Sequence, residues 1–201
     1  MAYLTWLIVG YAFGSIPFAV IIAKTRGVDI FKCGSGNPGA TNVMRSVGKW
    51  EGRLCFALDA IKGFVPVAIP LAFSYVPFSA HYAPNFACTA LVGALLGHSF
   101  SIWIKFRGGK GVATTVGGLF ALVPAVMAGG VLLWLVTFYL SRYVSLASIL
   151  MALWLPFGAW VFRADKISLF LVSFIGFLII LRHGANIGRL ISGTENQFGG
   201  K

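Results

Sequence analysis

Long uncharged segments dominate the chain, and clusters of basic residues separate them. No Lys, Arg, Asp or Glu occurs in residues 1–23, 64–104, 111–141 or 143–162. A helix of about 20 apolar residues is long enough to cross the hydrocarbon core of a bilayer. Apolar and polar residues do not alternate as they do in strands, and lipid accepts only helices or closed barrels. The pattern therefore predicts an all-α, polytopic membrane protein, which we expect to form a single domain over residues 1–201.

Five predicted spans follow directly from the apolar segments. They cover residues 3–23, 54–75, 86–104, 144–162 and 167–181. The link at residues 76–85 contains two prolines and no full charge, so we expect it to be a short outer loop.

Residues 111–141 fit either one long span or two short ones. Two helices that turn near Pro124 place Arg142, Arg182 and Arg189 on the side of the other basic loops, as the positive-inside rule requires. Each helix would have only about 15 residues, or ~22 Å, which is tolerated where broken helices pack against protein or line a cavity. We therefore expect seven transmembrane helices, with the N-terminus outside and the C-terminus in the cytoplasm.

The net charge of +11, from 16 Lys and Arg against 5 Asp and Glu, agrees with this topology. In a soluble protein this excess would suggest nucleic-acid binding. Here the basic residues flank the spans, where they set orientation and attract anionic head groups, so we expect no nucleic-acid partner. The loop after the first span carries six of them: Lys24, Arg26, Lys32, Arg45, Lys49 and Arg53.

Two glycine-rich polar loops interrupt the apolar pattern, and the predicted topology places both in the cytoplasm. Loop 1 is GSGNPGATN at residues 34–42, and loop 2 is FRGGKGVAT at residues 106–114. Glycines let backbone N–H groups turn toward an anion, and Lys or Arg adds a full charge. Loop 2 is also expected to open a helix near Gly111, whose dipole would point at the same anion as Lys110. The loops are predicted to bind phosphate; the alternative is a pair of flexible turns whose charges only set topology.

Neither loop is a nucleotide-binding motif of a soluble fold. Gly34-x-Gly36-x-x-Gly39 matches the dinucleotide fingerprint only as a string, because that fingerprint follows a strand in a βαβ unit. In loop 2 no Ser or Thr follows Lys110 directly, as it would in a P-loop. The sequence therefore does not support ATP hydrolysis.

A third polar cluster follows the last predicted span and contains Arg182, His183, Asn186 and, further on, Glu195. If the helix continues through it, His183 and Asn186 share a face because they are three residues apart. We expect His183 to be a substrate ligand. Glu195 either orients the cluster or ends a helix.

Polar residues inside the spans complete the candidates. Asp59 and Lys62 are three residues apart, and we expect an ion pair that supports the site in preference to a catalytic role. His98 follows Gly97 late in the third span and is expected either to pack in the core or to support the residues that bind substrate. Ser145 and Ser148 open the sixth span at its cytoplasmic end, where each either binds substrate or donates to a helix carbonyl.

Taken in order, these segments resemble the PlsY family of bacterial glycerol-3-phosphate acyltransferases, which use acyl phosphate as the donor. The resemblance covers nearly the whole chain and rests on GSGNPGATN with Arg45, Leu58-Asp59 with Lys62-Gly63, Gly97-His98, GGKGVAT, the segment RYVSLAS, and Arg182-His183 with Asn186. It implies seven spans in the bacterial cytoplasmic (inner) membrane and an active site that faces the cytoplasm.

The family reaction transfers a fatty acyl group from acyl phosphate to the 1-hydroxyl of sn-glycerol 3-phosphate, giving lysophosphatidic acid and inorganic phosphate. The donor is a mixed anhydride that is already activated. The protein then has to hold two anions, orient the hydroxyl and stabilise the developing charge. Another large class of glycerolipid acyltransferases uses a His with an Asp five residues later, and here Phe86, Trp103 and Gly188 stand in that place.

We therefore expect a mechanism without a covalent intermediate. The N–H groups of residues 108–111, with Ser35 or Asn37, would hold the acyl phosphate. Arg45, Lys110, Ser148, His183 and Asn186 would hold glycerol 3-phosphate, although the two phosphates could be exchanged between the loops. A phosphate oxygen of the donor is the expected proton acceptor, with His183 as the alternative.

Catalysis is expected to depend on His183, Lys110, Arg45 and Ser35. The expected substrate-binding residues are Ser35, Gly36, Asn37, Thr41, Asn42, Arg45, Gly108, Gly109, Lys110, Gly111, Thr114, Ser145, Ser148, His183 and Asn186, and the expected supporting residues are Asp59, Lys62, His98, Arg182 and Glu195.

Two other functions share part of this pattern. A transporter of a phosphorylated metabolite also needs basic groups and broken helices, but its anion site should lie near the middle of the bilayer. A head-group transferase that uses a divalent metal needs clustered carboxylates, which five scattered acids do not supply. We expect no metal and no cofactor, and membrane lipid as the surroundings. The oligomeric state stays open, and a monomer is compatible with the sequence.

Overall fold

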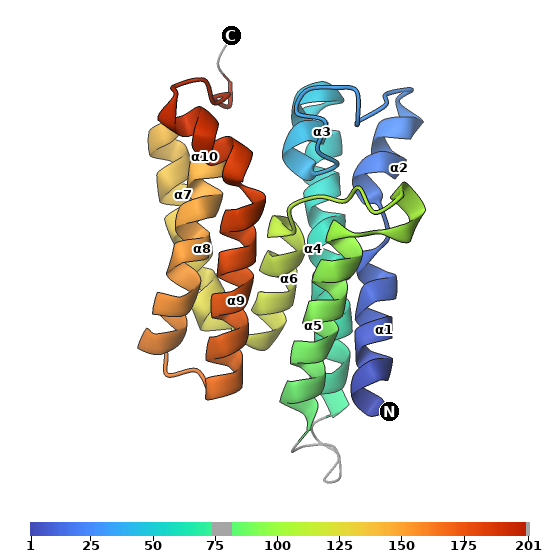
Figure 1. Ribbon diagram of the computed structural model, residues 1–201, viewed down its shortest axis with the longest axis vertical. Helices are drawn as coiled ribbons and strands as arrows, with labels where there is room; N and C mark the ends of the chain where they lie inside the picture. Colours follow the sequence, from blue (N-terminus) through green and yellow to red (C-terminus); the bar gives the residue numbers. More distant parts are fainter. Residues whose placement is uncertain (74–81, 200–201) are drawn as a thin grey trace. The chain divides into compact units, whose positions relative to one another are not determined.

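The computed structural model describes residues 1–73 and 82–199, and every regular element assigned within them is a helix. The end of the predicted second span, most of the predicted outer loop at residues 76–85 and Lys201 lie outside the described residues. The chain forms two compact units, Met1–Leu122 and Val123–Lys201 (Figure 1). That residues 1–201 act as one domain stays a prediction.

Over residues 1–73 and 82–122, the first unit has six α-helices and one short 3₁₀ helix among its assigned elements. They are α1 (Ala2–Gly14), α2 (Phe18–Thr25), α3 (Ala40–Ser46), α4 (Lys49–Ala72), α5 (Ala83–Ser99), η2 (Ile102–Ile104) and α6 (Val112–Leu122). The second unit contains α7 (Pro124–Ser141), α8 (Val144–Val161), α9 (Lys166–Arg182) and α10 (Gly184–Ile191).

Within the described residues, five helical segments are long and apolar enough to cross a membrane, and a sixth is added if α9 and α10, bent by 58°, count as one span. α1 and α2 together form one of the five. α6 is apolar but has only 11 residues, about 16 Å at 1.5 Å per residue, roughly half the hydrocarbon core. The structure thus shows five to six candidate spans, and the count of seven stays a prediction.

The predicted division of residues 111–141 is confirmed. α6 ends at Leu122, and α7 begins at Pro124, a position where proline costs no helical hydrogen bond. The two helices have 11 and 18 residues, so the division is less even than the sequence suggested.

The first predicted span is interrupted, which hydropathy did not indicate. α1 ends at Gly14 and α2 begins only at Phe18. Pro17 lies at the break, and it has no N–H to continue the helical bonds. A break inside a membrane span exposes backbone groups that need partners from the protein.

Glycines bring the helices of the first unit into backbone contact. A Cβ added to Gly14 of α1 would collide with the carbonyl of Ala94 in α5, and one added to Gly97 of α5 would collide with that of Tyr11. Such close approach through small residues is typical of membrane helices.

α4 and α6 approach each other in the same way. A Cβ on Gly63 of α4 would collide with the backbone of Thr114 near the start of α6. This contact fixes the start of α6, where loop 2 ends, against the middle of α4.

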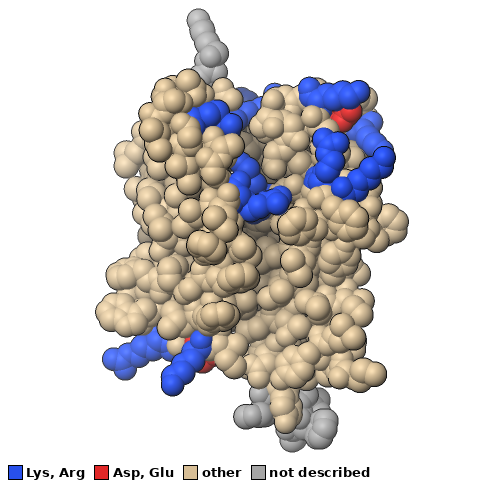
Figure 2. Space-filling model, viewed as in Figure 1, with Lys and Arg blue, Asp and Glu red and all other residues tan. Residues whose placement is uncertain are grey.

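Charge and apolar surface are separated in the first unit. Lys and Arg side chains gather at the end that carries α2 and α3 (Figure 2). Along the helices, large apolar side chains such as Ile8, Ile61 and Leu96 stay exposed, as expected for a surface that faces lipid.

Candidate active site

Loop 1 is shaped by the side chain of Asn42, the third residue of α3. Its Nδ2 donates to the carbonyls of Ile30 and Cys33 at 3.2 and 3.0 Å, and its Oδ1 accepts from the N–H of Ser35 at 3.1 Å. Asn42 is 3% exposed. We expected it to bind substrate, but the structure uses its amide to hold the loop, so this expectation needs correction.

The remaining polar groups of loop 1 are more accessible. Gly34 and Gly36 have φ values of +55° and +65°, which glycine adopts without steric cost, and they turn the chain sharply around Ser35. Ser35 is exposed and Thr41 is half-buried. Arg45 is exposed in the last turn of α3.

Loop 2 is closed by backbone hydrogen bonds to the end of α5. The N–H of Gly108 donates to the carbonyl of Ser99 at 3.1 Å, and that of Gly109 donates to the carbonyl of His98 at 3.2 Å. We expected both N–H groups to bind an anion, but they are used inside the protein. The sequence could not reveal this, because a glycine-rich string does not say where its N–H groups point.

The start of α6 supplies N–H groups and partial positive charge at the end of loop 2. Gly111 turns the chain with a φ of +84°, and the helix begins at Val112, as the sequence predicted. The first N–H groups of any helix have no partner within it, and the helix dipole adds partial positive charge there. Lys110 directly precedes this turn. Thr114 is fully buried in the first turn of α6.

The two loops meet in the first unit. Phe31, Ser35, Gly36, Asn37 and Pro38 from the loop 1 side, and Arg107 and Gly108 from loop 2, line an open groove of about 290 Å³. The guanidinium carbon of Arg107 lies 4.6 Å from the centroid of the Phe31 ring, a cation–π contact that joins the two sides. The prediction that both loops face the same way is confirmed.

Arg107 and Phe31 were missing from the predicted site residues. Arg107 stands three residues before Lys110 in loop 2, so its charge was a usable signal. Phe31 carried no such signal, because one aromatic residue in a loop indicates no partner.

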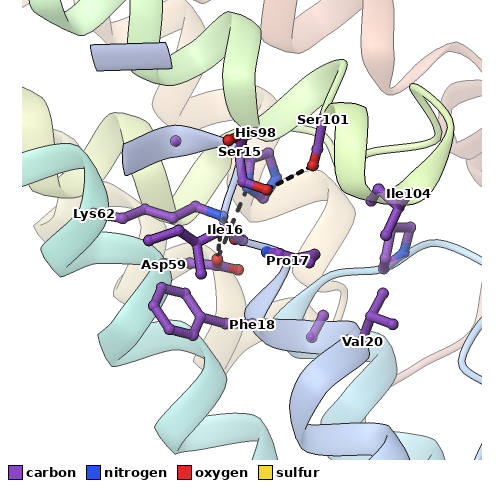
Figure 3. Close-up of a pocket in the computed structure, with 13 residues that line it drawn as sticks. Ser15, Ile16, Pro17, Phe18, Val20, Asp59, Lys62, His98, Ser101 and Ile104 are labelled. Carbon is purple, nitrogen blue, oxygen red and sulfur yellow. Dashed lines mark hydrogen bonds and ion pairs between the residues drawn. The ribbon is translucent and has the colours of Figure 1, made fainter. Parts of the chain in front are cut away.

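A buried charged cluster lines a small cavity at the break between α1 and α2 (Figure 3). Lys62 Nζ is 2.7 Å from Asp59 Oδ1 and donates to the carbonyl of Ile16, in the break between α1 and α2, at 2.8 Å. His98 Nδ1 lies 3.9 Å from the same Asp59 oxygen. The predicted ion pair is confirmed, and His98 is buried beside it.

In the second unit the chain bends at His183, so the helix does not continue through the third cluster. α9 ends at Arg182 and α10 starts at Gly184, which removes the premise that His183 and Asn186 share one helix face. His183 Nδ1 lies 2.7 Å from the carbonyl of Ile179. A carbonyl only accepts, so Nδ1 carries the hydrogen and Nε2 of the neutral ring is the basic nitrogen.

Glu195 organises this cluster, which settles the choice left open by the sequence. Its Oε1 accepts from Asn186 Nδ2 at 2.7 Å and from Ser145 Oγ at 2.8 Å, and its Oε2 accepts from Arg189 Nε at 2.7 Å. Burial raises the pKa of this carboxyl group, but these three hydrogen bonds and the charge of Arg189 outweigh burial and hold the pKa below its ordinary value. The carboxylate connects α8 to α10.

Replacing Glu195 by Gln is expected to lower the melting temperature at pH 7, because a neutral amide cannot compensate Arg189 or accept all three bonds. We expect the free energy of unfolding to fall by about 1.5–3 kcal/mol. Since the folded pKa is lowered, the stabilisation is complete above the unfolded value of 4.5 and is lost as the pH falls below it. Melting curves in detergent should therefore converge for wild type and variant as the pH drops below 4.5.

The matched control is Asp29→Asn, which removes an exposed carboxylate 3.8 Å from Lys32. Exposed ion pairs contribute little to folding stability, so the melting temperature of Asp29→Asn should equal that of wild type. A Glu195→Gln variant as stable as wild type at pH 7 would contradict the role given to this carboxylate.

The two serines of α8 differ in their partners. Ser145 donates to Glu195, whereas Ser148 Oγ donates to the carbonyl of Val144 at 2.8 Å and accepts from Trp134 Nε1 at 3.2 Å. Trp134 had no signal in the sequence, because it lies in an apolar helix. Arg182 is half-buried at the end of α9.

Across residues 1–73 and 82–199, no group of three or more His, Cys, Asp or Glu side chains is arranged as it would be around a metal ion.

Helices long and apolar enough to cross a membrane, and a groove lined by two glycine-rich loops, define a protein of the integral membrane class. The sequence model of the family described as glycerol-3-phosphate acyltransferase matches residues 4–193, and the chain belongs to this family.

The relatives agree in length as well as in sequence. Glycerol-3-phosphate acyltransferase of Mesorhizobium japonicum is 39% identical over 97% of this chain and 95% of its own length. That of Aquifex aeolicus is 43% identical over 96% of this chain and 97% of its own.

Two solved structures are similar throughout. Both are crystal structures of PlsY, an integral membrane glycerol 3-phosphate acyltransferase, in a glycerol 3-phosphate form and a lysophosphatidic acid form. Each is 40% identical to this chain, and the alignment includes 99% of this chain and 96% of the solved one. The TM-scores are 0.90 for the glycerol 3-phosphate form and 0.88 for the lysophosphatidic acid form.

Proposed function

We propose that this membrane enzyme transfers a fatty acyl group from acyl phosphate to the 1-hydroxyl of sn-glycerol 3-phosphate. Glycerol-3-phosphate acyltransfer is the activity of its full-length relatives, and it is favoured over transport of a phosphorylated metabolite. The observation that carries the proposal is the groove that the two loops line together, with Arg107 and Gly108 on its loop 2 side. Lys110 and the start of α6 follow these residues directly in the chain. A groove between two glycine-rich basic loops of a membrane protein suits two substrates that both carry phosphate, one of which is a lipid.

The acyl phosphate is proposed to bind at the end of loop 2. The first N–H groups of α6, together with Lys110, supply the positive charge that a phosphate requires. The N–H groups of Gly108 and Gly109 contribute by closing the loop, since they donate to protein carbonyls. Ser35 and Asn37 stand on the opposite side of the groove.

Glycerol 3-phosphate is proposed to bind to Arg45, Ser148, His183 and Asn186, with Lys110 shared between the substrates. What supports this is the family resemblance and the chemistry of each residue. Arg45 is exposed on α3, and the amide of Asn186 is oriented by Glu195.

The reaction needs no covalent intermediate. The 1-hydroxyl oxygen of glycerol 3-phosphate attacks the acyl carbonyl carbon, and the bond between that carbon and the phosphate oxygen breaks. The hydroxyl proton passes to an oxygen of the departing phosphate, and His183 Nε2 is the alternative acceptor. Lys110 and the start of α6 stabilise the negative charge that the phosphate gains as it leaves.

The proposed topology has seven spans, with α6 as a short one, the N-terminus outside, and loops 1 and 2 in the cytoplasm. The basic end of the first unit supports this orientation, because Lys and Arg collect on the cytoplasmic side of membrane proteins. The proposed location is the bacterial inner membrane.

Donor identity and metal independence are tested together with purified protein and glycerol 3-phosphate. We expect lysophosphatidic acid from palmitoyl phosphate but not from palmitoyl-CoA, at a rate unchanged by EDTA. Product formed equally well from palmitoyl-CoA would refute the proposed donor. A rate lost with EDTA and restored by Mg²⁺ would refute the mechanism without metal.

A further inference from the structure

We propose that Asp59, Lys62 and His98 form a positioning unit, here called the buried triad, that sets the distance between loop 1 and loop 2. The inference rests on the proposed acyltransferase function, because it assigns these residues a role in aligning the two substrates.

Lys62 binds the backbone at the break between α1 and α2. Lys62 Nζ donates at 2.8 Å to the carbonyl of Ile16, one of the backbone groups exposed by the break between α1 and α2 (Figure 3). From the other side, Ser101 Oγ donates to the carbonyl of Ser15 at 2.6 Å. Ser101 precedes η2 and loop 2, so the break is bonded both to α4 and to the segment that leads into loop 2.

The Asp59 carboxylate lies between the other two members of the buried triad. Asp59 Oδ1 lies 2.7 Å from Lys62 Nζ and 3.9 Å from His98 Nδ1, and the side chains of all three residues are at most 6% exposed. One carboxylate thus lies between the lysine that binds the helix break and the histidine at the end of α5. Losing either partner of a buried ion pair leaves an uncompensated charge, which is strongly destabilising.

His98 contacts loop 2 at Gly109, and Gly109 in turn lies next to loop 1. The carbonyl of His98 accepts from the N–H of Gly109. A Cβ added to Gly109 would collide with His98 Nε2 and would stand 3.1 Å from the carbonyl of Pro38 in loop 1. Gly109 is therefore confined between the His98 ring and loop 1, and any shift of the ring changes the spacing of the loops.

Stability alone does not explain why the chain keeps charges here. Ionisable groups within a membrane span are expensive, and well-packed apolar residues can replace a buried ion pair without loss of stability. The buried triad lies where a helix break and both substrate-binding loops converge. We infer that it is retained because it fixes this geometry.

The test removes both charges at once. Asp59→Asn combined with Lys62→Met leaves no unpaired buried charge, so we expect it to elute from size exclusion as wild type does. Its kcat/KM for both substrates should fall by about tenfold or more, since displaced substrates react slowly. Amide hydrogen exchange in residues 106–112 should become faster.

The matched control is Arg26→Gln combined with Glu51→Gln, which removes a 2.7 Å ion pair in the same unit whose partners are 61% and 15% exposed. Its kcat/KM and its exchange in residues 106–112 should equal those of wild type. If Asp59→Asn with Lys62→Met behaved like this control, the ion pair would be structural only and the proposal would be wrong.

A second pair of variants serves if the double variant does not fold. His98→Gln keeps a nitrogen near the position of Nε2, whereas His98→Ala removes it. We expect His98→Ala to lose about tenfold in kcat/KM and His98→Gln to recover most of it. Equal activity in the two variants would overturn the role of His98. A wild-type protein without acyl transfer would refute the proposed function instead, and hydrogen exchange would still test the positioning.

Discussion

Replacing Lys110 by Ala is expected to reduce kcat/KM for acyl transfer by about 100- to 1,000-fold, the usual cost of removing one group that stabilises transition-state charge. The lysine stands at the turn into α6, where the positive end of the helix already favours phosphate. The departing phosphate gains charge during the reaction, so the ammonium group acts most strongly in the transition state. Initial rates of lysophosphatidic acid formation over both substrate concentrations measure the loss.

Lys24→Ala is the control, because Lys24 is exposed at the end of α2 and belongs to the same basic end of the first unit. It removes the same charge and should leave kcat/KM unchanged. If both variants lost activity equally, net charge at the membrane surface would explain the effect. A Lys110→Ala enzyme with wild-type kinetics would remove loop 2 from the mechanism.

Replacing His183 by Ala is expected to raise the KM for glycerol 3-phosphate by about 10- to 100-fold, as for the loss of a hydrogen bond to a charged group. In the same variant kcat should be largely kept, because the donor phosphate is the proposed proton acceptor. The bond from Nδ1 to the carbonyl of Ile179 orients the ring. Separate determination of kcat and KM distinguishes binding from proton transfer.

His183→Asn is the informative companion, since its amide can still donate as Nδ1 does but has no basic nitrogen. The proposed mechanism predicts a kcat near wild type for both variants. A collapse of kcat in both, with little change in KM, would make His183 the general base.

The sequence predicted the helices and the ion pair well because each has a local signal. Basic residues on either side of residues 111–141 indicated the division near Pro124. The spacing of Asp59 and Lys62 indicated an ion pair, because charges inside a span require partners. Topology predicted that loops 1 and 2 lie on one side of the membrane, since basic segments collect there. That they line one groove is seen only in the structure.

What the sequence missed depends on three-dimensional packing. The hydropathy pattern did not predict the break after α1, because Pro17 lies among apolar residues and the mean hydropathy of the segment stays high. The bend at His183 has no proline at all. Which N–H groups of loop 2 are used inside the protein depends on the carbonyls of Ser99 and His98, which reach the loop only in the folded chain.

The role of Asn42 shows the same limit for side chains. Its type and place in a glycine-rich loop suit a phosphate ligand as well as a loop scaffold. Only the positions of the Ile30 and Cys33 carbonyls decide for the scaffold.

The most direct test of the central claim is the stoichiometry of phosphate release by the purified protein with palmitoyl phosphate. We predict one lysophosphatidic acid for each inorganic phosphate released, and no phosphate release above the protein-free rate when glycerol 3-phosphate is omitted. If no acylated product formed, while proteoliposomes containing the protein took up glycerol 3-phosphate, the protein would be a transporter and the acyltransferase account would be wrong.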